Sequence, residues 1–317
     1  METLLKLTQN EWMKLWSRKS SWIMIILLAL ILLASAAITK WVDNSMDMNN
    51  TESWQEVETN EMIYNQSMLE DNSLSEAQRE FYEGEVAISE HRLENDLPPY
   101  EYDSMQQGVI DSHIMMSVVT LFTVIIAGGI VAAEFSQGTI KMLLTRPVKR
   151  WKILTSKYIA TMLYAILLAI VLFIVTAIAG LIFYGISDGT FLTWNGSEVV
   201  EGSFWLEGLK MLALSFASVW IIGTFAFMLG TVFRSSSLAI GLSIFLMFTG
   251  IQAVFLLANY EIVKYYLFTH TDLTQYYTGF MPVEDITMTM SVIVLIVYFI
   301  IFMAISYLTF SKRDVTA

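Results

Sequence analysis

The sequence predicts an all-α polytopic membrane protein with six transmembrane helices. Of its 317 residues, 55% are hydrophobic and 15% are charged, and the mean hydropathy of +0.56 lies far above that of soluble proteins. Six apolar runs are long enough to cross a bilayer, and the polar segments between them differ in the sign of their charge. The chain contains no cysteine, which excludes a disulfide framework and thiolate chemistry.

Residues 1–20 are predicted to form an amphipathic helix at the membrane interface. Apolar and aromatic side chains recur along one helical face: Leu5, Trp12, Leu15 and Trp16. The bases Lys6, Lys14 and Arg18 lie off this face, where they would meet anionic lipid. The alternative is a basic flank that only orients the first span, which we expect at residues 21–39.

Residues 40–112 form an acidic insert, with 18 Asp or Glu against two Arg between positions 43 and 111. Periodic apolar residues predict an extracellular helical hairpin with a turn at 71–73, and Ser73 with Glu76 fits a capping box for its second helix. A sensing or cargo-receiving role and a merely solvated spacer are both compatible with this pattern. Three potential ligands share one helical turn, but without a second histidine we expect no metal there: Glu90, His91 and Glu94.

The remaining spans follow from apolar runs of 20 or more residues. We expect them at 113–133, 158–184, 209–233, 238–258 and 288–310. A cytoplasmic turn at 234–237 and a cytoplasmic tail at 311–317 are predicted on one side, and an irregular extracellular loop at 185–208 on the other. The aromatic-rich residues 259–287 are expected to form a second extracellular loop, either an interfacial belt or a re-entrant hairpin.

The distribution of basic residues predicts the orientation. Both termini, residues 134–157 and Arg234 together carry 13 Lys or Arg and 4 acids, whereas the opposite side carries 5 bases and 26 acids. By the positive-inside rule, both termini lie in the cytoplasm. The protein is therefore expected to be a multi-pass protein of the cell (plasma) membrane.

Residues 134–157, called here the basic island, separate the second and third spans. They contain one acid, Glu134, and six bases: Lys141, Arg146, Lys149, Arg150, Lys152 and Lys157. Burying six such charges at the bilayer centre would cost roughly 18 kcal/mol, so we expect the island to be a cytoplasmic loop in contact with water.

Several kinds of chemistry have no support in the sequence. No ionisable residue lies in the middle of an expected span, and the GxxxxGK[ST], HExxH and GxSxG motifs are absent. We therefore expect this chain to be no enzyme, to bind no cofactor or metal, and to have no nucleic-acid partner. An energised process would need a separate partner, for which the basic island is the natural docking place.

The basic island carries a specific resemblance. Its residues Glu134, Gly138, Thr139, Leu143, Leu144, Pro147, Arg150 and Lys157 stand as in the motif of type-two ABC exporter permeases, the ABC-2 permease family. The chain resembles this family in topology over most of its length, although the motif itself covers about two dozen residues. The long acidic insert resembles versions from Gram-positive bacteria.

The resemblance implies a coupling helix at Gly138 to Leu144 that enters a groove of a cytoplasmic ATPase subunit. The family role would fall on Glu134, Gly138, Thr139, Ile140, Leu143, Leu144, Pro147, Arg150 and Lys157. Gly138 would break the span helix, and Glu134 and Lys157 would fix the ends of the coupling segment. The alternative is a basic loop that only obeys the positive-inside rule and touches anionic lipid.

The implied function is ATP-driven export of an amphiphile such as a lipid-like molecule, peptide or antibiotic. Two permease protomers, identical or related, would work with two ATPase subunits that hold ATP and Mg. The expected substrate path lies along spans two and five, at Ser117, Thr120, Thr123, Ser243 and Thr249. The alternative function is a membrane sensor whose acidic hairpin binds an extracellular peptide without net transport.

Overall fold

The computed structural model of the protein describes residues 2–45, 53–71, 74–136, 138 and 148–312. Within them, six helical stretches are long and apolar enough to cross a membrane, which confirms the predicted fold class. They are α2 (Lys19–Ser45), α5 to α6 (Met105–Ile110, Asp111–Met115 as the 3-10 helix η1, Met116–Ser136), α8 (Arg150–Phe183), α9 (Phe204–Phe233), α10 (Ser236–Leu257) and α12 (Met288–Lys312).

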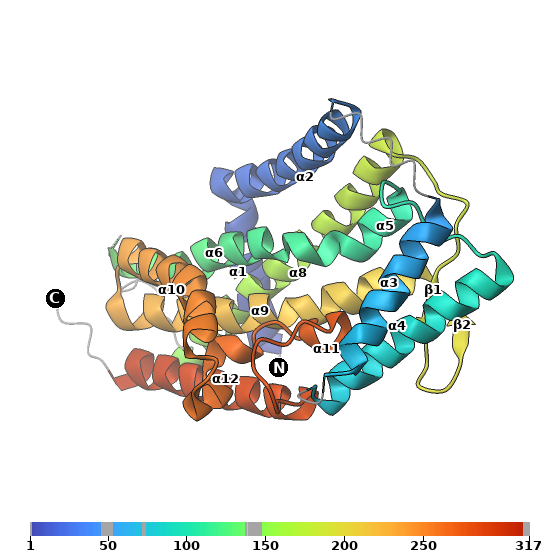
Figure 1. The fold of residues 1–317 in the computed structure, drawn as a ribbon. Coiled ribbons are helices and arrows are strands. Elements are labelled where there is room, and N and C mark those ends of the chain that lie inside the picture. The colour runs from blue at the N-terminus through green and yellow to red at the C-terminus, as the bar shows by residue number, and fades with distance from the viewer. Residues whose placement is uncertain (1, 46–52, 72–73, 137, 139–147, 313–317) are drawn as a thin grey trace.

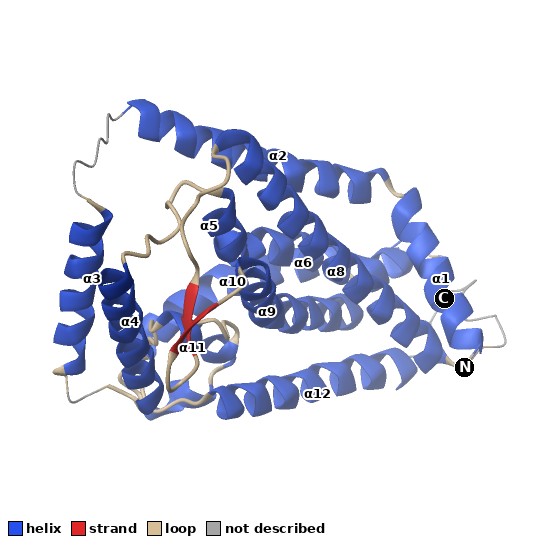
Figure 2. Cartoon of the chain, turned by 90° about the vertical axis from the view of Figure 1, so that its right-hand side faces the viewer, coloured by secondary structure: helices blue, strands red, loops and turns tan. Residues whose placement is uncertain are grey.

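The bundle has two unlike ends, which Figure 2 shows at opposite sides. The terminal end holds α1 (Glu2–Ser17) and the last turn of α12. The hairpin end holds α3 (Trp54–Leu69), α4 (Glu76–Asn95), β1 (Leu192–Trp194) and β2 (Val199–Glu201). In Figure 1, the elements of the hairpin end (α3, α4, β1 and β2) lie toward the right of the view.

The helix α8 begins earlier than expected. It starts at Arg150 rather than near Tyr158, so the last part of the basic island is helical and continuous with the third span. The residues between these positions include no glycine or proline, and helix formation therefore propagates through them. The bases Lys152 and Lys157 are placed by α8 and do not belong to a loop.

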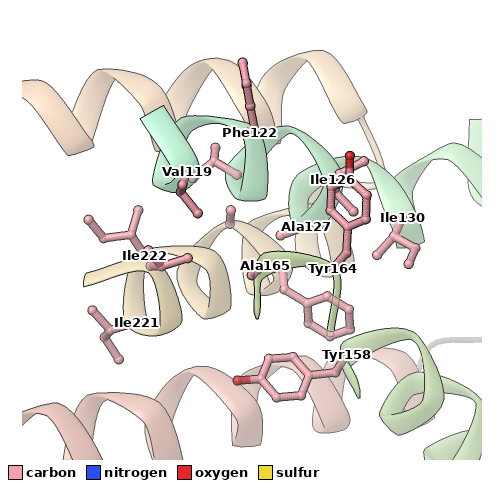
Figure 3. Packing of buried hydrophobic residues seen from close by; sticks show 14 of the residues in the cluster. Val119, Phe122, Ile126, Ala127, Ile130, Tyr158, Tyr164, Ala165, Ile221 and Ile222 are labelled. Atoms are coloured by element: carbon pink, nitrogen blue, oxygen red, sulfur yellow. The ribbon is translucent and has the colours of Figure 1, made fainter. Parts of the chain in front are cut away.

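The centre of the bundle is the contact between α6 and α9. An added Cβ on Gly230 of α9 would lie 2.5 Å from the carbonyl oxygen of Gly128 in α6, so the two backbones meet directly. Small residues at such a crossing allow close helix packing in lipid. Buried side chains from α6, α8 and α9 surround this contact, and Figure 3 labels Val119, Phe122, Ile126, Ala127, Ile130, Tyr158, Tyr164, Ala165, Ile221 and Ile222.

The acidic insert folds as the predicted pair of helices. Each helix begins at a capping box, in which a serine side chain and the third helical residue satisfy each other's backbone N–H groups. The second box consists of Ser75 and Gln78, so the predicted box of Ser73 and Glu76 is wrong. Both pairs have the same spacing, and the sequence pattern could not distinguish them.

The loop expected to be irregular at 185–208 contains a β-hairpin. Strands β1 and β2 pair antiparallel with Leu192 opposite Glu201. The turn is held by the side-chain carbonyl oxygen of Asn195, which accepts hydrogen bonds from the backbone N–H groups of Ser197 and Glu198. Gly196 has a φ of +93°, a conformation that favours glycine at this turn.

Residues 259–287 contain three short helices, of which the second packs against α10 and α12 and the third against α4. These are the 3-10 helices η2 (Glu261–Tyr265) and η3 (Leu267–His270), followed by α11 (Gln275–Thr278). A small apolar cluster fixes the segment: Val254, Val263, Val283 and Ile286. The contact with η3 is close, because an added Cβ on Gly250 would lie 2.5 Å from the ring of Phe268.

The helices α3 and α4 enclose a polar interior. Arg92 and Glu58 are both buried, with Arg92 Nε 3.8 Å from Glu58 Oε1, and the guanidinium also donates to the carbonyl oxygen of Thr190 at 3.1 Å. Burial, and then the negative charges of Glu58 and Glu61, raise the pKa of the nearby Glu85 to about 7, although Arg92 opposes this. One cation therefore faces three carboxylates.

We predict that Glu85 makes the protein less stable as the pH rises. Between its unfolded value of 4.5 and about 7, the folded protein holds this proton more tightly than the unfolded chain, so stability is lost across that window, by about 3 kcal/mol at most. Thermal unfolding of the purified protein at several pH values should show this loss, and Glu85→Gln should reduce it. The exposed neighbour Glu83 provides the control Glu83→Gln. An unchanged pH profile in Glu85→Gln would contradict the prediction.

We predict that Gly230→Ala destabilises the bundle by about 1–3 kcal/mol, because the added methyl group must push α9 away from α6. Gly241→Ala in α10 is the matched control, since an added Cβ there meets nothing within 4 Å and alanine has the higher helix propensity. Thermal unfolding in detergent micelles compares the two variants. Equal midpoints would refute the close approach of the two backbones.

Candidate functional site

A buried group of charges lies at the terminal end, where the expected coupling segment leaves and re-enters the bundle. It comprises Glu11, Lys14, Glu134 and Lys157, called here the ionic cluster. Lys157 is its centre and is only 1% exposed. Its Nζ atom lies 2.5 Å from Glu134 Oε1 and 2.7 Å from Glu11 Oε2. One ammonium thus binds carboxylates from two other helices.

Three helices position these groups. Glu134 lies in the last turn of α6, and Lys157 lies in the second turn of α8. Glu11 belongs to α1, which packs against α8 through a buried face that also includes Thr8 and Leu15. The spacing of three and four residues between these positions places them on one side of the helix. The cluster therefore fastens α1 to the junction of α6 and α8.

Lys14 balances the charge of the cluster. Its Nζ atom lies 2.6 Å from Glu11 Oε1 and 3.6 Å from Glu134 Oε1, and its side chain is 41% exposed. Two ammonium groups therefore accompany two carboxylates. Because an unpaired buried charge costs several kcal/mol, this balance is what permits Lys157 to be buried at all.

The carboxyl of Glu11 is held in its charged form. Burial alone would raise its pKa, but the positive charges and hydrogen bonds of Lys157 and Lys14 outweigh burial and lower the pKa below its ordinary value of 4.5. The side chain is an ion-pair partner rather than a proton donor.

The structure corrects the expected environment of Lys157. The sequence predicted that the whole basic island stays in water, yet Lys157 is buried between its two carboxylate partners. The ion pairs with Glu11 and Glu134 offset most of the free-energy cost of burying a charge, on which that prediction was based. Glu134 and Lys157, the residues expected to fix the ends of the coupling segment, are in direct contact, and their coupling role stays a prediction.

Sequence reasoning missed Glu11. Glu11 is one of the four acids on the side of the termini. The sequence pattern assigns the apolar face of the first helix to residues that include Leu5 and Leu15. In the structure Leu5 is 71% exposed and Leu15 is buried together with Glu11. The only sequence feature that pointed to Glu11 was its spacing of four residues from Leu15, which puts both residues on the same face of a helix.

Side chains from other helices close around the same end. Arg150 Nη1 donates to the carbonyl oxygen of Ser311, 3.0 Å away near the end of α12. Arg234, at the end of α9, lies 4.7 Å over the ring of Phe135, which in turn packs edge-on against Phe310. The ends of α6, α8, α9 and α12 are thus joined next to the ionic cluster.

Part of the expected coupling segment can be placed. α6 ends at Ser136, and Gly138 has a φ of +70°, as expected if glycine breaks the span helix. The other predicted positions lie outside the described residues: Thr139, Ile140, Leu143, Leu144 and Pro147.

The five residues of the predicted substrate path have different environments. Thr120, Thr123 and Ser243 are buried, whereas Ser117 and Thr249 are exposed on the bundle surface. The hydroxyls of Thr120 and Thr249 donate to carbonyl oxygens of their own helices, at 3.0 and 2.8 Å. The hydroxyls of Thr123 and Ser243 have no hydrogen-bond partner among the described residues. Among the five residues of the predicted substrate path, Thr123 and Ser243 are therefore those whose buried hydroxyls remain free, within the described part of the chain, to hydrogen-bond a substrate.

No group of three or more His, Asp or Glu within the described ranges is arranged to hold a metal ion. Glu90, His91 and Glu94 belong to these ranges.

One family model and two curated relatives are similar to the chain. Residues 93–316 match the family described as "Protein of unknown function (DUF2705)". The "Uncharacterized protein YhcI" of Bacillus subtilis is 37% identical over 317 residues, covering 98% of this chain and 99% of the relative. The "Uncharacterized membrane protein YdbK" of the same organism is 33% identical over 199 residues, covering 61% of this chain and 76% of the relative. The second name agrees with the six apolar helices.

We predict that Lys157→Met destabilises the protein by about 3–5 kcal/mol, because it leaves Glu11 and Glu134 buried without their central cation. Lys152→Met is the control, since it removes the same charge from a partly exposed position of α8. Unfolding in denaturant, followed by tryptophan fluorescence, measures both.

Adding Glu11→Gln to Lys157→Met should restore part of the lost stability, because Lys14 then faces one carboxylate, that of Glu134, instead of two. A Lys157→Met variant as stable as Lys152→Met would show that the cluster does not support the bundle.

Proposed function

We propose that this chain, which belongs to the family of proteins of unknown function DUF2705, is the membrane-spanning subunit of an ATP-driven exporter. A separate cytoplasmic ATPase subunit would hold ATP and Mg and would hydrolyse the nucleotide. A second permease protomer, identical or related, would complete the transport unit. Catalysis is assigned to the partner and not to this chain.

The observation that carries the proposal is the ionic cluster. Glu134 and Lys157 stand on either side of residues 138–149, and their contact joins the end of α6 to the start of α8. A partner that moved this segment would therefore move two spans together, and Glu11 would pass the motion to α1. Such a connection is suited to transmitting work from a docked ATPase, because ion pairs and packed helices resist small separations.

The charge distribution supports the orientation. The terminal end carries the excess of Lys and Arg, and the hairpin end carries most of the acids. We therefore place the terminal end in the cytoplasm and the hairpin end outside the plasma membrane. In this orientation the expected coupling segment is on the same side of the membrane as the proposed ATPase.

The proposed cargo is an amphiphile such as a lipid-like molecule, peptide or antibiotic. The buried hydroxyls of Thr123 and Ser243 lie on α6 and α10, the two helices of the predicted path. Apolar walls with few hydroxyl groups suit a largely apolar cargo better than a small ion.

The test is first whether an ABC ATPase is encoded beside this chain, and then reconstitution of the chain with that ATPase. We predict that the two proteins co-purify and that an amphiphile stimulates ATP hydrolysis. Leu143→Glu should abolish this stimulation while leaving membrane insertion intact, because it places a charge on the expected coupling helix. Ser197→Glu, at the exposed β-hairpin turn of the opposite end, is the control and should leave stimulation unchanged.

Unchanged stimulation in Leu143→Glu would refute the coupling role. Co-purification with a kinase and no ATPase would instead favour the membrane sensor.

A further inference from the structure

A cavity of about 860 Å³ opens at the hairpin end. Its walls come from α4, β1 with the preceding residue, the first turns of α9, α11 and the start of α12. Figure 1 shows α4, β1 and α11 close together, and both β1 and α11 contact α4. The volume lies within the range of about 300–1,000 Å³ that small-molecule sites occupy. The cavity is far from the ionic cluster and has no part in the role proposed for it.

Aromatic rings form much of the lining: Phe81, Phe191, Trp194, Tyr276 and Tyr277. Two of them are fixed against glycines. A Cβ added to Gly84 would lie 2.9 Å from Trp194 Cδ1, and a Cβ added to Gly279 would lie 2.5 Å from the ring of Phe81. The rings are thus held in place by direct contact with backbone, which favours a preformed site.

The charge of the cavity is unbalanced. Five acids and one base line it: Glu76, Glu80, Glu85, Glu207, Asp285 and Lys210. Lys210 is already engaged, with Nζ 2.7 Å from Glu207 and 4.4 Å over the ring of Tyr277. No ion pair within the described ranges neutralises the three carboxylates that α4 contributes. The cavity therefore attracts a cation.

A chain of buried hydrogen bonds holds Tyr276 in position. The carbonyl oxygen of Lys264 only accepts, so His270 Nε2 must donate to it at 2.9 Å. Burial lowers the pKa of His270 more than this hydrogen bond raises it, so the ring is neutral and its Nδ1 accepts from Ser291 at 2.6 Å. Ser291 must in turn accept the proton of Tyr276, 2.6 Å away.

The phenolic oxygen of Tyr276 thus has no proton left to donate. Its hydroxyl is hydrogen-bonded to the fully buried Ser291, which holds the Tyr276 ring in place as part of the cavity wall.

We propose that this cavity binds an amphiphilic organic cation of small-molecule size, a primary amine or guanidinium compound with an aromatic or apolar body. The carboxylates of Glu80 and Glu85 would take the N–H donors. The aromatic rings would cover the apolar body and add cation–π attraction. The proposal does not depend on export, because binding requires neither ATP nor a partner.

The test uses the full chain alone in nanodiscs of zwitterionic lipid. Isothermal titration calorimetry with 4-phenylbutylamine, corrected for empty nanodiscs, should show saturable binding at pH 8. The uncharged 4-phenylbutanol should bind at least about tenfold more weakly. The double variant Glu80→Gln, Glu85→Gln should weaken binding of the amine by at least about tenfold and leave the alcohol unaffected.

Glu90→Gln, Glu94→Gln is the matched control, because it removes two charges from the same helix away from the cavity and should bind the amine as the wild type does. Far-ultraviolet circular dichroism and thermal unfolding verify that both double variants are folded. Equal binding of the amine and the alcohol, or unchanged amine binding in Glu80→Gln, Glu85→Gln, would overturn the proposal. Since no ATPase is present, neither result bears on the exporter proposal.

Discussion

The burial of one ammonium group governs the terminal end of the molecule. Lys157 can leave water only because Glu11 and Glu134 approach it from α1 and α6, and those carboxylates can be buried only because Lys157 and Lys14 are present. Apolar packing against lipid gives helices little reason to choose one neighbour over another. The ionic cluster is specific, because each of its buried charges needs the others, and it therefore brings α1, α6 and α8 together.

The two ends of the bundle use polarity in opposite ways. Within the ionic cluster at the terminal end, two ammonium groups and two carboxylates are matched in number and lie within contact distance. At the hairpin end, the carboxylates of α4 outnumber their cations, and the surplus surrounds a space lined with aromatic rings. The matched set has the properties of a structural joint. The excess carboxylates of α4 suit a binding site, because a cation from outside the protein would neutralise them.

The sequence predicted what depends on hydropathy and on charge counted by segment. The six spans were expected on those grounds, the paired helices of the acidic insert from periodic apolar residues, and the break of α6 near Gly138 from the glycine and the family resemblance. It could not predict contacts between distant helices, such as that of Glu11 with Lys157, because an acid on an interfacial helix has the same pattern whether it faces water or a buried lysine. The β-hairpin was missed because its strands have only three residues each, too few for an alternating pattern. The cavity depends on residues of α4, β1, α9, α11 and α12 coming together, and no local sequence pattern predicts such a meeting.

The partnership of Glu11 and Lys157 also has a consequence for biosynthesis. The two residues are 146 positions apart, so α1 emerges from the ribosome long before α8. Until then the carboxylate of Glu11 lacks its principal partner, and α1 can lie at the membrane surface without a fixed neighbour. Arrival of Lys157 would fasten the first helix to the completed group of α6 and α8. The ion pair thus cannot form before the chain has been synthesised through Lys157.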